Sequence, residues 1–173
     1  TENMDFHTAS ALRKTKMSFK TVYSKEAYNK MLLVLNSFSP EVVHLNNFNY
    51  QLTPTVIQAV RDWEKSSNNR VKIIYTAHDY QLICPNHAMF NNGKICEACS
   101  GGKFISCLKG KCIHSSALKS LFGAMEAYFW TNKGIYEQLD KIICCSEFMK
   151  SKLDEYPIFK SKTQKLGILS KNT

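Results

Sequence analysis

Three short runs of aliphatic and β-branched residues constrain this chain more than any other feature. They lie at residues 41–45, 71–76 and 141–145, and such residues favour β-strands. Between the first two runs, Thr53-Pro54 places a hydroxyl cap before a proline at the first helical position, which is a typical helix start. Strands that alternate with helices require crossover connections. The sequence therefore predicts an α/β fold with a parallel sheet and helices on both of its faces.

The other expected elements follow from hydrophobic periodicity. A helix is expected to begin at Ser24 and to end before Pro40, because the residue that precedes a proline avoids the helical conformation. A long helix is expected from Ser116, with its large apolar residues facing the core, and a shorter helix is expected at 146–153. A fourth strand is expected at 165–169. The long helix carries Leu118, Leu121, Phe122, Met125 and Phe129 on one side.

The length of 173 residues fits one domain, and its 44% apolar and 21% charged residues are typical of a globular protein. The sequence contains no apolar run as long as a membrane span, and residues 1–17 contain no apolar stretch typical of a secretory signal. We therefore expect a single cytoplasmic domain over residues 1–173.

Polar residues follow each of the three predicted strands. The carboxyl ends of parallel strands meet at one edge of a sheet, where ligands bind in folds of this kind. We therefore expect a polar cleft lined by Asn46, Asn47, His78, Asp79, Ser146 and Glu147. His78 is the first candidate for the reaction centre, because an imidazole can donate to a phosphate or sugar oxygen or polarise a leaving group. Asp79 is expected to orient His78 or an acceptor.

Each of these residues also has a purely structural interpretation. Asn46 and Asn47 are common in turns, and Ser146 is a good helix cap. Glu147 is favoured near a helix N-terminus by the helix dipole, whatever its function. His44 lies within a predicted buried strand, where a hydrogen-bonded core histidine is expected.

The segments 41–47 (EVVHLNN), 75–80 (YTAHDY) and 144–149 (CCSEFM) together resemble the N-terminal domain of family 4 glycosyltransferases. These are retaining enzymes of the GT-B type, with two facing Rossmann-like domains, and the similarity runs from Pro40 to the C-terminus. It implies transfer of a sugar from a nucleotide-sugar donor to a saccharide or polyprenyl-linked acceptor, in the synthesis of a surface polysaccharide or glycolipid. It also implies that His78 lies near the donor sugar and its diphosphate, that Asn46 and Asn47 face the acceptor, and that no catalytic metal takes part.

The chain departs from the family pattern in two respects. Members of the family usually have His-x-His at the position of His44-Leu45-Asn46 in this sequence. A role that needs the second imidazole is therefore not assigned to this chain. The opening strand with its Gly-rich loop is not recognisable, and the C-terminal donor-binding domain is absent. We therefore expect residues 1–173 to form the acceptor-side half, incomplete at its N-terminus and inactive alone.

Cysteines are concentrated in one part of the chain, the segment 81–115, which we call the cysteine segment. Five of the seven cysteines lie there, and the segment has no sustained helical or strand periodicity. The spacing of Cys96 and Cys99, followed by Cys107 and Cys112, is compatible with a structural zinc or iron–sulfur site inserted as a loop. The alternative ligands are Cys84, His87 and His114, and the alternative interpretation is a set of reduced thiols that pack the loop on the sheet.

Basic residues dominate the same region. The net charge is +9, and between Lys94 and Lys119 there are five lysines and the single acid Glu97. With the apolar residues of the following helix, they are compatible with peripheral binding to an anionic membrane at the inner face of the cell membrane. A zinc-stapled module that binds nucleic acid is the alternative function, and it leaves the three strand-end motifs unexplained. Because the resemblance implies a sugar transferase, we expect no nucleic-acid partner.

Overall fold

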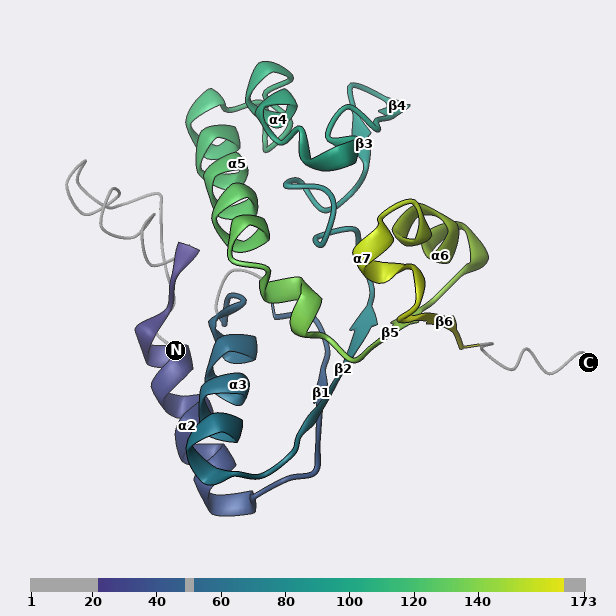
Figure 1. Ribbon diagram of the computed structural model, residues 1–173. Coiled ribbons are helices and arrows are strands. Elements are labelled where there is room, and N and C mark those ends of the chain that lie inside the picture. Colours follow the sequence, from purple (N-terminus) through teal and green to yellow (C-terminus); the bar gives the residue numbers. More distant parts are fainter. Residues whose placement is uncertain (1–21, 49–51, 167–173) are drawn as a thin grey trace, which may run out of the picture.

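The computed structural model describes residues 22–48 and 52–166, and in this part of the chain the fold is α/β (Figure 1). Its main sheet has four strands in the order β1 (Val42–Leu45), β2 (Lys72–Ala77), β5 (Lys141–Cys144) and β6 (Thr163–Lys165). All neighbouring strands of this sheet pair in parallel. The predicted parallel sheet is therefore confirmed. The fourth strand lies a few residues earlier than expected, and the expected end at 169 falls outside the described residues.

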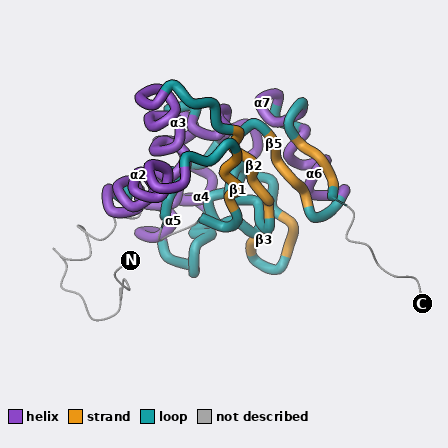
Figure 2. Tube along the Cα trace, turned by 90° about the horizontal axis from the view of Figure 1, so that it is seen from below, coloured by secondary structure: helices purple, strands orange, loops and turns teal. Residues whose placement is uncertain are grey.

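The strands lie in the sheet in chain order, so each connection steps to the next strand in the same direction. Helix α3 (Thr55–Ser67) joins β1 to β2, and α5 (Ala117–Asn132) with η2 (Ile135–Gln138) leads to β5. Helices α6 (Glu147–Asp154) and α7 (Pro157–Lys160) lead to β6. Figure 2 shows the strands side by side between α3 and the pair α6 and α7.

Burial along the strands shows which face the helices cover. In β1, Val43 and Leu45 are buried, whereas Val42 and His44 are exposed. In β2 and β5, buried residues alternate with residues of intermediate burial after an exposed first residue. In the described residues, helices flank the sheet, and one face of the sheet is buried more deeply than the other. The expectation of a buried His44 was wrong for this reason. Its side chain points to the accessible face, where Nε2 lies 2.7 Å from Thr76 Oγ1.

Helix α2 (Lys25–Phe38) precedes the sheet and packs on α3. Ser24 caps its first turn by accepting the Ala27 amide at 3.2 Å, as its hydroxyl predicts. The indole Nε1 of Trp63 donates to Asn36 Oδ1 at 2.8 Å and joins the two helices. These contacts hold the helix pair as one layer.

One arginine ties this layer to the amino ends of the strands. Arg61 donates to the Val71 carbonyl at 2.9 Å and pairs with Asp140 at 2.8 Å. The same carboxylate oxygen of Asp140 accepts the Ile73 amide at 2.7 Å. Because these residues stand at the start of β2 and just before β5, Arg61 fixes the end of the sheet opposite the predicted cleft.

The cysteine segment contains short elements: β3 (Phe90–Asn91), β4 (Lys94–Ile95), η1 (Ser100–Gly102) and α4 (Ile105–Lys109). β3 and β4 form a hairpin whose turn residues Asn92 and Gly93 have positive φ angles of 50° and 78°. Asn-Gly is the preferred sequence for such a turn. Figure 1 shows these elements gathered beside α5, away from the main sheet.

The buried side of α5 differs from the prediction. Its buried residues are Ser120, Ala124 and Trp130, whereas Leu118 and Met125 are 62% and 43% exposed. Small residues are buried because the cysteine segment lies close against this side of the helix. A Cβ on Gly123 would come within 2.4 Å of the Ile113 side chain.

Candidate functional site

Three strand ends bring polar groups together at the carboxyl edge of the sheet. Leu45 pairs with Tyr75 and Ala77 pairs with Cys144, so the residues that follow β1, β2 and β5 emerge next to one another. His78 Nε2 lies 3.4 Å from Asn46 Oδ1, and His78 Nδ1 lies 4.0 Å from Cys145 Sγ.

The imidazole of His78 is held between these neighbours but is itself exposed. Cys145 is further fixed by a hydrogen bond from its thiol to the Ala77 carbonyl at 3.1 Å. An imidazole exposed in this way can donate a hydrogen bond to a bound oxygen or exchange a proton with it. Cys145 was not among the predicted cleft residues, although its position directly after a strand could have suggested it.

Asp79 organises the loop that follows His78. Its Oδ1 accepts the Gln81 amide at 2.9 Å, and its Oδ2 lies 3.8 Å from His87 Nδ1. The Tyr80 amide also donates to the His87 carbonyl at 2.9 Å. Burial lowers the pKa of His87 and Asp79 opposes this shift, so the pair joins the strand end to the start of the cysteine segment.

The other three predicted cleft residues are exposed. Asn47 follows Asn46 at the end of β1. The hydroxyl of Ser146 accepts the Met149 amide at 3.1 Å and caps α6, as its structural interpretation predicts. Glu147 lies in the first turn of α6, 3.2 Å from Lys165 Nζ. Ser146 thus adjoins the His78 cluster through Cys145, and Glu147 directs its charge toward β6.

A partly buried carboxyl group that the sequence did not single out lies behind this edge. Glu126 of α5 and His87 line a small cavity of about 20 Å³ with Tyr136 and Gln81, a volume suited to one water. Burial raises the pKa of Glu126 to about 8. Within the described residues, the buried Gln81 Nε2 has no hydrogen-bond partner. The only sequence signal was an acid among apolar residues of a helix.

The thiols of the cysteine segment lie near one another. Burial and the neighbouring thiols of Cys84, Cys112 and Cys96 raise the pKa of Cys99 to about 12. The pKa of Cys107 is also raised to about 12, by burial and by the thiols of Cys112, Cys99 and Cys84. All seven cysteines are free thiols. As the side chains stand, no three His, Cys, Asp or Glu residues in 22–48 and 52–166 are arranged to hold a metal ion.

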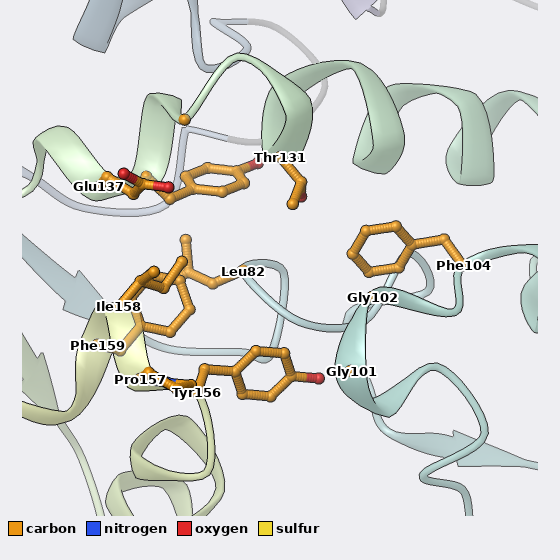
Figure 3. Close-up of a pocket in the computed structure, with 12 residues that line it drawn as sticks. Leu82, Gly101, Gly102, Phe104, Thr131, Glu137, Tyr156, Pro157, Ile158 and Phe159 are labelled. Atoms are coloured by element: carbon orange, nitrogen blue, oxygen red, sulfur yellow. The ribbon is translucent and has the colours of Figure 1, made fainter.

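An apolar cavity of about 280 Å³ separates the cysteine segment from the sheet layer (Figure 3). Gly101, Gly102 and Phe104 line it from one side, and Tyr156 and Phe159 line it from the other. None of the six predicted cleft residues contributes to its wall. The cavity is therefore not the predicted polar cleft.

The exposed part of α5 is both apolar and basic. Leu118, Leu121 and Met125 are exposed, and so is Lys119. The described helices include none with the length and apolar character needed to cross a bilayer.

Comparison of the chain with protein-family models, with curated proteins and with solved structures finds no match.

Proposed function

We propose that this chain is the acceptor-side, Rossmann-like domain of a retaining GT-B glycosyltransferase. The main support is the meeting of Asn46, His78 and Cys145 at the ends of three adjacent parallel strands, with 3.4 Å between the imidazole and the amide oxygen. Sugar transfer needs polar groups fixed at such an edge, open toward a second domain that binds the nucleotide. The cysteine segment is then an insertion between β2 and β5 of that domain.

In this proposal, the exposed ring of His78 contacts the donor sugar or its leaving phosphate. Asn46 restrains the ring on one nitrogen, and the thiol of Cys145 lies near the other. Asn46 and Asn47 face the acceptor, and Ser146 and Glu147 border the cleft at the start of α6. Positive side chains and helix N-termini stabilise the leaving diphosphate, so the proposal assigns no catalytic metal.

The experiment uses the whole polypeptide encoded by the gene, assayed against a panel of nucleotide sugars with saccharide and polyprenyl-linked acceptors. His78→Ala should lower turnover by about 100- to 10,000-fold, the usual contribution of a positioned acid or base. The fold should persist, because the side chain is exposed. His44→Ala is the matched control, since His44 is also exposed but points to the accessible sheet face.

Unchanged turnover in His78→Ala would remove this assignment. Absence of sugar transfer, together with steeply salt-dependent binding to nucleic acid, would favour the alternative of a basic nucleic-acid-binding module.

The surface of α5 supports a lipid-linked acceptor. Leu118 and Leu121 are exposed beside Lys119, which suits an anionic bilayer surface. We expect the chain to sediment with phosphatidylglycerol vesicles and to bind phosphatidylcholine vesicles far less. Replacing Leu118 and Leu121 with Asp should abolish sedimentation, whereas Leu33→Asp on α2, which is 67% exposed, should leave it unchanged. Equal binding by both variants would exclude α5 as the membrane contact.

A further inference from the structure

The cysteine segment has too small an apolar core to explain its defined backbone. Residues 82–84 and Met89 are buried with the main core, so the segment's own core consists of Cys99, Phe104 and Cys107, which pack with Ala124 of α5. The regular structure around them consists of two-residue strands and one short helix. Six residues of this segment adopt a left-handed backbone although they are not glycine: His87, Met89, Asn92, Lys111, His114 and Ser115. Loops of this length in compact domains are usually either functional or held by a staple.

Backbone turns bring the thiols to this small core. The Cys112 amide donates to the Cys107 carbonyl at 3.1 Å, so α4 and its following turn place these two cysteines together. Cys112 also packs against the core that contains Cys99 and Cys107. Cys96 leaves the β3–β4 hairpin with its amide bonded to the Met89 carbonyl at 2.8 Å.

The Cys96–Cys99 turn is anchored from outside. A hydrogen bond from the Ser100 amide to the Glu97 carbonyl at 2.9 Å closes it, and the Glu97 side chain pairs with Lys152 of α6 at 2.5 Å. Cys-x-x-Cys is a spacing at which structural zinc sites present two thiolates to the metal.

The charge of the segment also suits a thiolate centre. Four thiolates and one Zn²⁺ carry a net charge of −2, which is unfavourable unless cations lie near. The segment supplies these cations as exposed lysines, and its one acid is already paired with Lys152. The lysines are Lys94, Lys103, Lys109 and Lys111.

We infer that Cys96, Cys99, Cys107 and Cys112 bind one structural zinc ion, which staples the cysteine segment. As free thiols these side chains are not arranged around a metal. Zinc binding therefore requires the thiols to reorient, and a cysteine side chain can do this by moving between staggered rotamers. Cys84 is excluded from the set, because it packs in the main core and its thiol donates to Asn86 Oδ1 at 2.9 Å. The inference does not depend on the proposed sugar transfer.

The test is the zinc content of the purified chain after dialysis against a weak chelator. We expect about one zinc per chain, as in structural four-cysteine sites. Replacing any one of Cys96, Cys99, Cys107 and Cys112 with serine should lower the zinc content to about a tenth of the wild-type value or less. Cys84→Ser and Cys145→Ser are matched controls and should keep the metal. A wild-type chain without zinc, or with a coloured iron–sulfur centre, would overturn the inference.

A second measurement covers variants that misfold locally. Removing zinc from the wild-type chain with a strong chelator should increase hydrogen exchange about 10-fold or more within 86–115 and leave β2 and β5 protected. Exchange that is unchanged by the chelator would show that thiol packing alone holds the segment. Zinc loss in Cys84→Ser but not in Cys96→Ser would overturn the ligand assignment.

Discussion

The sheet layer and the cysteine segment both bury side chains almost completely, but by different means. In the sheet layer, Ile73 and Ile142 are fully buried, and they lie in strands that pair residue by residue with their neighbours. In the cysteine segment, Cys107 is 1% exposed although the surrounding chain is mostly turns. Periodic apolar residues define the first region. Short-range turns and clustered thiols define the second, so equal burial does not mean an equal source of stability.

A matched pair of substitutions measures this difference. Phe159 and Phe104 are 1% and 3% exposed, and both line the same apolar cavity. Phe159→Ala opens a hole in the main core and should cost about 3–5 kcal/mol of unfolding free energy. Phe104→Ala should cost about 1–2 kcal/mol, because its smaller core can open without unfolding the sheet. Urea denaturation gives both values.

Hydrogen exchange locates the effect of each variant. Phe159→Ala should speed exchange in the whole main sheet. Phe104→Ala should speed it only in the cysteine segment and the adjoining turn of α5, where Tyr128 packs edge-on against Phe104 with ring centroids 5.1 Å apart. Equal losses of stability with the same exchange pattern would mean that the two regions unfold as one unit.

A smaller effect is expected at the boundary between the regions. Burial raises the folded-state pKa of Glu126 from its ordinary value of 4.5 to about 8. Below pH 4.5 both the folded and unfolded states hold this proton. Between about pH 4.5 and 8 only the folded state keeps it, so this group lowers stability as the pH rises through that window.

Glu126→Gln should remove this dependence. We expect the variant to match the wild-type melting temperature near pH 5 and to exceed it by a few degrees at pH 8. Thermal melts at the two pH values, with Glu137→Gln as an exposed control on η2, provide the measurement. Parallel melting curves for wild type and variant would show that Glu126 ionises freely in the folded chain.

The sequence predicted the strands and helices that have a regular apolar pattern or a recognisable cap. The β-branched runs located β1, β2 and β5, and the caps at Ser24, Ser116 and Ser146 located three helix starts. It also predicted that groups from separate strand ends would meet, because parallel strands share one carboxyl edge.

The features that it missed depend on packing between distant segments. His44 lies in a strand whose pattern indicates burial, but whether a given sheet face is covered depends on other parts of the chain. The burial of Ser120 and Ala124 in α5 depends on the approach of the cysteine segment, which the absence of a side chain at Gly123 permits. The environment of Glu126 could not be predicted from its own helix, since residues far apart in the sequence, such as Pro54, His87 and Tyr136, line the same cavity.

The agreement between strand order and chain order has a consequence for how this domain can vary. Each crossover begins and ends at neighbouring strands, so material added between β2 and β5 shifts neither the β1–β2 nor the β5–β6 register. The connection that carries the cysteines can therefore change in length or be replaced without altering the pairing of the main sheet. Its first residues leave directly from the edge that carries His78, so such an exchange would alter what borders that histidine without re-pairing a single strand.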